Sequence, residues 1–250
     1  MRGRFTWDLR RLKRVLCGMA AGLVLVSCGS DDSAPVRPEI TPQDFALVPC
    51  GPGLAERPCA LVVAGGKRVL FGAPAGVAAT LTQEDLRGLD AVMLFSLRAV
   101  DIEGLDEVRN ETWWAGRDEP LLVAGPEGTT QLVEALNKAF EQSDALRVVE
   151  EGIPKGGYDA AILIGSNVGS GERPFDTGDF YITAKGTGNW DMGYGSHGDL
   201  GVGFVIRSCN SDIYPYEEGM TPVDFHGYVG CAAACQYQWP LTETVFIVKN

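Results

Sequence analysis

Cysteine and histidine are the side chains of this sequence best suited to hold a metal ion, and few of them fall close together. Cys231 and Cys235 are four residues apart, and His226 precedes them. Zinc accepts such ligands. No fourth ligand stands at a usual zinc spacing, because the only other histidine of the chain is His197. We therefore interpret Cys231 and Cys235 as structural cysteines.

A serine nucleophile would need a base and an acid beside it. Ser196, His226 and Asp224 are one set that a fold could bring together, since the members of a catalytic triad converge only in three dimensions. The segment 193–198 reads Gly-Tyr-Gly-Ser-His-Gly, which differs from the G-x-S-x-G pattern that exposes a catalytic serine. We interpret it as a tight polar loop and predict no catalytic residue here.

Cys28 directly follows an apolar stretch, 15–27. This stretch is shorter than the roughly 20 residues that a membrane-spanning helix needs. Six basic side chains and one acidic side chain lie within the first 27 residues. This pattern is typical of a signal peptide, 1–27. Residues 25–28, Leu-Val-Ser-Cys, resemble a bacterial lipobox, which implies that the Cys28 thiol carries a lipid and binds the bilayer.

The residues after Cys28 predict where the protein is held. Segment 28–42 is rich in polar residues and turn formers, which indicates a flexible tether before a domain at 43–250. Gly29 follows the cysteine, and the absence of aspartate there resembles the sorting pattern of outer-membrane lipoproteins. We expect a lipid-anchored protein of the bacterial cell envelope, at the outer membrane and facing the periplasm.

Five cysteines remain for the oxidising environment beyond the membrane, so at least one must stay free or pair between chains. Cys50 and Cys59 flank a glycine-proline turn and could close a short loop. Cys231 and Cys235 would be near the upper limit of disulfide reach on a helix. Cys209 could compete for either pair.

Composition limits both size and partners. The 250 residues are 45% hydrophobic, enough for one sizeable core and too few for two comfortable domains. The net charge is −12, and the chain beyond its basic first 27 residues is more acidic still. A polyanion repels phosphate backbones, so we expect no nucleic-acid partner.

Hydrophobic periodicity predicts the elements that must position any site. The first half alternates strands and helices, which favours an α/β layered fold: strands 60–64 and 68–71, helix 82–89, strand 91–95, helix 102–114, strand 121–124 and helix 129–140. The second half is mainly β, with predicted strands at 160–164, 180–184, 202–206 and 244–248.

Several blocks between residues 47 and about 152 resemble metallo-β-lactamase-fold hydrolases of the ribonuclease Z and arylsulfatase-like branch. Segment 59–66 is similar to the opening hairpin of that family, 69–76 to its "LFDAGAG" turn and 123–129 to its "VYGPEGT" block. The resemblance implies an α/β, metallo-β-lactamase-like αββα sandwich. It also implies that this sandwich is incomplete in its C-terminal half, because the family's last segments have no counterpart here.

The same resemblance locates the family's metal loop, "THxHxDH", at residues 95–101. Ser96 and Arg98 take the places of the first two histidines, Val100 that of the aspartate and Asp101 that of the last histidine. No imidazole remains. The guanidinium of Arg98 stays protonated and would repel a divalent cation at this position.

The other metal positions of the family are also replaced. Gly72 stands for an aspartate, Glu150 and Glu151 for the "HHG" histidines, and Asn189 for the histidine of "VDH". We therefore expect a vestigial pocket made of Ser96, Arg98, Asp101, Asn189, Glu150 and Glu151, with no metal and no cofactor.

Three functions fit these replacements. We favour a non-catalytic, membrane-anchored module whose cleft, with Arg98 at its centre, binds a small anion or an envelope protein. A metal-dependent hydrolase of esterase or phosphodiesterase type is the alternative, with a rewired site drawn from His197, Asp199, Asp101 or Glu151. The third is a purely structural body whose pocket is closed by an ion pair of Arg98 with Asp101 or Glu151.

Overall fold

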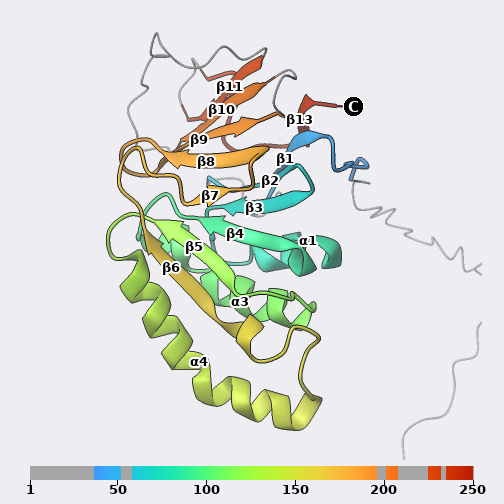
Figure 1. The fold of residues 1–250 in the computed structure, drawn as a ribbon, viewed down its shortest axis with the longest axis vertical. Helices are drawn as coiled ribbons and strands as arrows, with labels where there is room; N and C mark the ends of the chain where they lie inside the picture. Colours follow the sequence, from blue (N-terminus) through green and yellow to red (C-terminus); the bar gives the residue numbers. More distant parts are fainter. Residues whose placement is uncertain (1–36, 52–57, 196–200, 208–224, 232–234, 250) are drawn as a thin grey trace, which may run out of the picture. The chain divides into compact units, whose positions relative to one another are not determined.

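The computed structural model describes residues 37–51, 58–195, 201–207, 225–231 and 235–249, which form two β-sheets and several helices (Figure 1). These residues belong to one unit of the chain, which starts at Arg37. The predicted signal peptide and Cys28 lie outside the described residues, and so do Ser196, His197, Asp199, Cys209 and Asp224. None of the described helices is both long enough and apolar enough to cross a membrane.

The larger sheet has seven strands in the order β13-β1-β2-β3-β4-β5-β6. Strands β3 to β6 are parallel neighbours, whereas β1, β2, β3 and β13 pair in antiparallel fashion. The strands are β1 (Phe45–Pro49), β2 (Ala60–Ala64), β3 (Lys67–Phe71), β4 (Leu89–Met93), β5 (Leu121–Gly125), β6 (Leu163–Asn167) and β13 (Val245–Val248).

The smaller sheet has six strands in the order β12-β11-β10-β9-β8-β7. It is antiparallel from β7 to β10, and β11 and β12 then continue in parallel pairing. The strands are β7 (Phe175–Asp176), β8 (Phe180–Ala184), β9 (Asn189–Tyr194), β10 (Val202–Arg207), β11 (Phe225–Gly230) and β12 (Tyr237–Gln238).

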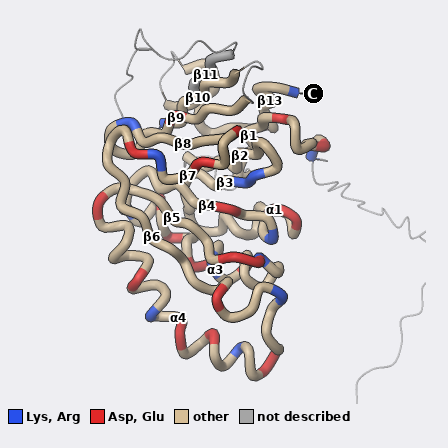
Figure 2. Tube along the Cα trace, viewed as in Figure 1, with Lys and Arg blue, Asp and Glu red and all other residues tan. Residues whose placement is uncertain are grey.

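The helices pack on the face of the larger sheet that points away from the smaller one. Leu70, Val92 and Val123 of that face share a buried cluster with Leu105 and Val133 of the helices. Acidic and basic positions follow one another along α4 (Figure 2). The helical elements are η2 (Ala78–Thr80), α1 (Gln83–Arg87), α2 (Ala99–Ile102), α3 (Leu105–Trp114), α4 (Thr129–Glu151) and η3 (Asp159–Ala161).

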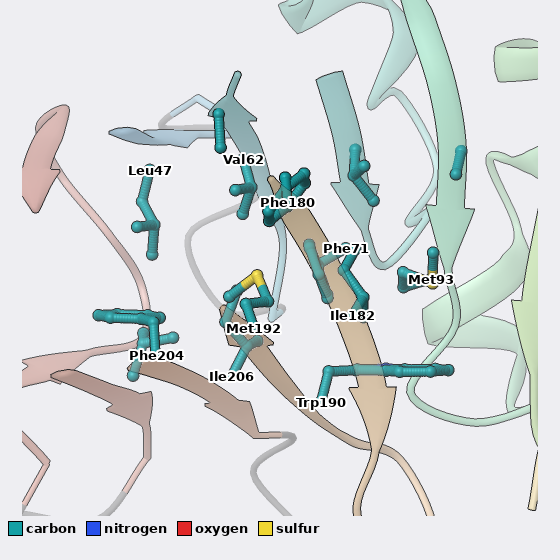
Figure 3. Packing of buried hydrophobic residues seen from close by; sticks show 14 of the residues in the cluster. Leu47, Val62, Phe71, Met93, Phe180, Ile182, Trp190, Met192, Phe204 and Ile206 are labelled. Atoms are coloured by element: carbon teal, nitrogen blue, oxygen red, sulfur yellow. The ribbon is translucent and has the colours of Figure 1, made fainter. Parts of the chain in front are cut away.

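The main core lies between the two sheets. Phe71 and Met93 of the larger sheet pack in one buried cluster with Phe180, Trp190 and Phe204 of the smaller sheet (Figure 3). The order helices, sheet, sheet confirms the predicted α/β sandwich. Among the described residues the outer face of the smaller sheet carries no helix, so the sandwich has three of its four predicted layers there.

Two predicted elements differ from the structure because of local packing. The predicted helix 102–114 is divided at Gly104, where a Cβ atom would lie 2.2 Å from the carbonyl oxygen of Pro74. The predicted strand 160–164 begins only at Leu163, because Ala160 and Ala161 form η3 and pack beneath Trp113. Helix α4 continues beyond the predicted residue 140 to Glu151.

The cysteines resolve one of the alternatives left open by the sequence. Cys50 and Cys59 form a disulfide with a Cα–Cα distance of 5.6 Å, which confirms the predicted short loop. Cys231 is disulfide-bonded and Cys235 is a half-buried free thiol, so a Cys231–Cys235 bridge is wrong. The expected unpaired thiol is therefore present at Cys235.

Removing the Cys50–Cys59 disulfide should destabilise the domain. A cross-link that closes a loop of this length lowers the entropy of the unfolded chain, and its loss should cost about 3 kcal/mol. The double variant Cys50→Ser/Cys59→Ser should therefore unfold at lower urea concentration than the wild type. Cys235→Ser is the matched control, and an equal loss in that variant would refute the assignment.

Ion pairs connect Arg37, at the start of the described chain, and Arg68 of β3 to Asp85 of α1. Asp85 is 2% exposed and accepts hydrogen bonds from Arg37, from Arg68 and from Thr82. Thr82 in turn caps the start of α1, because its hydroxyl oxygen accepts from the backbone N–H of Asp85 at 3.1 Å. Burial acts to raise the pKa of Asp85, but the hydrogen bonds from Thr82 and Arg37 and the charge of Arg37 outweigh it and lower that pKa below 3.8.

The lowered pKa of Asp85 predicts a loss of stability in acid. Its carboxylate stabilises the fold fully above the unfolded pKa of about 4, and this contribution is lost as pH falls through the lower folded pKa. The Asp85→Asn variant should be less stable than the wild type by about 1–3 kcal/mol at pH 7. Urea unfolding from pH 7 to pH 2 should show this difference shrinking below pH 4; a constant difference would contradict the assignment.

Candidate functional site

The predicted metal loop follows β4 and closes on itself through hydrogen bonds. The hydroxyl of Ser96 donates to the Oδ2 atom of Asp101, and the backbone N–H of Arg98 donates to Ser96 Oγ at 3.1 Å. Asp101 is 7% exposed, and its backbone carbonyl accepts from Ala73 N–H at 2.9 Å. The hydroxyl of Ser96 and one carboxylate oxygen of Asp101 are thus bonded to each other across the loop.

Arg98 lies at the rim of this loop and not in its interior. It is exposed and precedes the first residue of α2. Within the described part of the chain its guanidinium forms no ion pair, because Asp101 bonds to Ser96 and Glu151 pairs with Arg147 at 3.3 Å. The ion pair that would have closed the pocket is therefore not formed.

The sequence-distant residue Asn189 is brought beside this loop. It is the first residue of β9 and is 3% exposed. The preceding Gly188 has φ +71°, and a Cβ atom there would lie 2.2 Å from the carbonyl oxygen of Phe95. The backbone before Asn189 therefore lies directly against the start of the predicted metal loop.

Glu150 and Glu151 are not part of the site, and the prediction that placed them in the vestigial pocket is wrong. Both are exposed in the last turn of α4. Because α4 connects the parallel strands β5 and β6, its end lies near the start of β6, whereas Ser96 follows the end of β4. These two acids are therefore at the opposite edge of the sheet from Ser96.

The substitution Gly72→Asp would not fit the present backbone. Its φ is +76°, and a Cβ atom would lie 2.5 Å from the carbonyl oxygen of Pro58 and 3.3 Å from the ring of Phe95. Any side chain at this position would require the backbone to move.

The residues that follow β4 do not fit a dinuclear metal centre. Such a centre needs several imidazole and carboxylate ligands that converge. The described residues contain no group of three or more histidine, cysteine, aspartate or glutamate side chains able to hold a metal ion. At the predicted position only Asp101 is a carboxylate, and Ser96 already donates to it.

A cavity of about 500 Å³ lies next to this loop. It is lined by residues that follow the ends of β5 and β6 and by the turn between β8 and β9. Of the predicted site residues only Asn189 lines it; Ser96, Arg98 and Asp101 do not. The ends of parallel strands are a common place for ligands in α/β proteins.

The amino-acid sequence holds little signal for the other cavity residues. Glu127 lies within a block of resemblance, and the spacing of Asn167, Glu172 and Trp190 does not mark them as site residues. Because these four residues come from three separate segments, spacing along the chain could not group them. The one available signal was the glycine-rich composition of 165–171 and 186–188.

Comparisons with known proteins find only distant structural likenesses. The sequence matches no protein-family model and no curated protein. Human tRNase Z, short form, is 12% identical with a TM-score of 0.47, and covers 67% of this chain and 70% of its own. The metallo-β-lactamase fold protein YhfI from Bacillus subtilis is 14% identical with a TM-score of 0.40. The similarity covers 74% of this chain and 85% of YhfI.

A metallo-β-lactamase motif mutant from Cronobacter sakazakii is also similar, at 10% identity and a TM-score of 0.37. The similarity covers 60% of this chain and only 55% of the Cronobacter protein. Nothing about activity follows from likenesses this distant. The chain is similar to metallo-β-lactamase-fold proteins, and its function has to be argued from its own residues.

Proposed function

We propose that this chain is a non-catalytic binding module, held at the bacterial outer membrane by a lipid on Cys28. The observation that carries the proposal is the hydrogen bond from Ser96 to the buried Asp101. It occupies the polar groups where the resemblance would place metal ligands. Without converging ligands the loop lacks the means to activate a water molecule through a metal ion.

A hydrolysis assay tests this proposal. The full-length protein, purified in detergent, is incubated with ester and phosphodiester substrates in the presence of zinc, manganese or iron(II). We expect no turnover above the protein-free rate, and no change in the variant Asp101→Asn. Glu111, an exposed residue of α3, provides the control variant Glu111→Gln. Metal-dependent turnover that Asp101→Asn abolishes and Glu111→Gln retains would establish the alternative hydrolase function.

The lipid anchor is tested separately. We expect mass spectrometry of protein isolated from membranes to find a diacylglyceryl group on Cys28 and no residue before it. An unmodified Cys28 on a chain that still carries residues 1–27 would contradict the anchor, and would leave the binding function to be judged by the other measurements.

Arg98 supports the anionic partner favoured by the sequence. Its exposed guanidinium can form a bidentate pair with a carboxylate on a small anion or on a protein partner. The variant Arg98→Gln should weaken such an interaction by about tenfold, the usual size for a lost charged hydrogen bond. Co-purification with envelope proteins that is equal for the wild type and Arg98→Gln would argue against this role.

A further inference from the structure

The cavity beside Asn189 has walls fixed by the backbone. Val168 N–H donates to the Gly125 carbonyl at 2.8 Å, and Ala184 N–H donates to the Glu172 carbonyl at 2.9 Å. Gly186 N–H donates to Ser170 Oγ at 3.0 Å, which joins the segment after β6 to the turn after β8. The cavity is therefore a preformed feature of the fold, within the size range of small-molecule sites.

Its charge is negative. The described lining residues include two carboxylates, Glu127 and Glu172, and no lysine, arginine or histidine. The amide of Asn167 accepts from Thr130 N–H at 2.9 Å and donates to Glu127 Oε1 at 3.3 Å, which orients the first carboxylate. Glu172 Oε2 accepts from Gly169 N–H at 2.7 Å. Each carboxylate is held at one oxygen, and the other oxygen remains available.

Two buried polar atoms of the lining residues have no hydrogen-bond partner among the described residues. They are Oδ1 of Asn189, an acceptor, and Nε1–H of Trp190, a donor. The two residues are 3% and 2% exposed. Buried polar groups in folded proteins are nearly always bonded, so this acceptor and this donor can each bond to a ligand in the cavity.

We propose that this cavity binds a small organic cation that carries a primary ammonium group and at least one hydroxyl group, such as an amino sugar. This inference goes beyond the proposed function, because it adds a cation site that is separate from the anion contact of Arg98. The ammonium group donates to Glu127, Glu172 or Asn189 Oδ1, and a hydroxyl oxygen accepts from Trp190 Nε1–H. A ligand anion would meet two carboxylates and no opposing charge.

Three sugars of the same shape test the ligand class: D-glucosamine, D-glucose and D-glucuronate. Calorimetric titration of the full-length protein in detergent should show glucosamine binding at least about tenfold tighter than glucose, the effect of one charge-assisted hydrogen bond. Glucuronate should bind weakest. Equal binding of glucosamine and glucose, tighter binding of glucuronate, or binding of none of the three overturns the inference.

Variants place the ligand in the cavity. Glu172→Gln and Glu127→Gln should each weaken glucosamine binding by about tenfold while leaving glucose binding nearly unchanged. Thr187→Arg, which adds a cation at an exposed lining position, should reverse the preference toward glucuronate. Glu150→Gln removes the same charge at the end of α4 and should change nothing. Glucosamine binding that none of the cavity variants alters would contradict the site.

The results that would contradict this inference differ from those that would contradict the proposed function. Metal-dependent turnover would contradict the non-catalytic function whatever the sugars show. Glucuronate binding that is lost in Arg98→Gln would support an anion-binding module and overturn only the cation site of the cavity.

Discussion

Asp144→Asn should destabilise the domain by about 3–5 kcal/mol, the usual cost of removing one partner from a buried ion pair. Asp144 and Arg109 are 4% and 2% exposed, and their two contacts measure 2.5 and 3.1 Å. Burial, and then repulsion by Arg109, lower the pKa of the nearby Arg117 to about 10. Without Asp144, the buried guanidinium of Arg109 would lack its carboxylate while still facing the positive charge of Arg117, which places the loss toward the upper end of this range.

Urea unfolding measures this effect, and two variants serve as controls. Glu151→Gln removes a carboxylate from an exposed pair with Arg147 on the same helix, and should cost less than about 1 kcal/mol. The double variant Arg109→Met/Asp144→Leu replaces both charges with apolar groups and should recover most of the lost stability. A double variant that is no more stable than Asp144→Asn would show that the pair stabilises the fold by more than mutual neutralisation.

Gly188→Ala should destabilise the fold by about 3 kcal/mol, through left-handed backbone strain and a clash together. A methyl group at this position would lie 2.2 Å from the carbonyl oxygen of Phe95, a backbone atom that cannot turn away. The turn between β8 and β9 would have to move off the predicted metal loop. Because this turn also lines the cavity, glucosamine binding should weaken in the same variant.

The same turn offers a control for Gly188→Ala. Gly186 has a similar φ of +67°, but a Cβ atom there would have nothing within 4 Å. Gly186→Ala therefore introduces the backbone strain without the clash and should cost about 1 kcal/mol. Thermal unfolding of both variants separates the two causes, and equal losses would show that contact with Phe95 is unimportant.

The first half of the fold was predictable because its local signals agree with its packing. The hairpin of β2 and β3 follows from two apolar runs around Gly65 and Gly66, both of which have positive φ. The loop containing Ser96, Arg98 and Asp101 was located by blocks of resemblance that stay in order along the chain. Asn189 follows Gly188, whose backbone lies against Phe95 at the start of that loop.

The second half was less predictable because tertiary packing decides its elements. Strand β9 has the sequence Asn-Trp-Asp-Met-Gly-Tyr, and its glycine is required where the ring of Tyr181 packs 2.1 Å from a virtual Cβ atom of Gly193. From its sequence alone, a segment of this composition is predicted to be a loop. The position of Glu150 was wrong because a short match in spelling gives no information on which end of a helix faces the site.

We expect the loop after β4 to bind no metal ion. The most direct measurement is the zinc, iron and manganese content of the full-length protein isolated from its own membranes after growth with these metals in excess. The account predicts far less than one metal ion per chain, unchanged in Asp101→Asn. One or two ions retained per chain through gel filtration, and lost in Asp101→Asn but kept in Glu111→Gln, would contradict it.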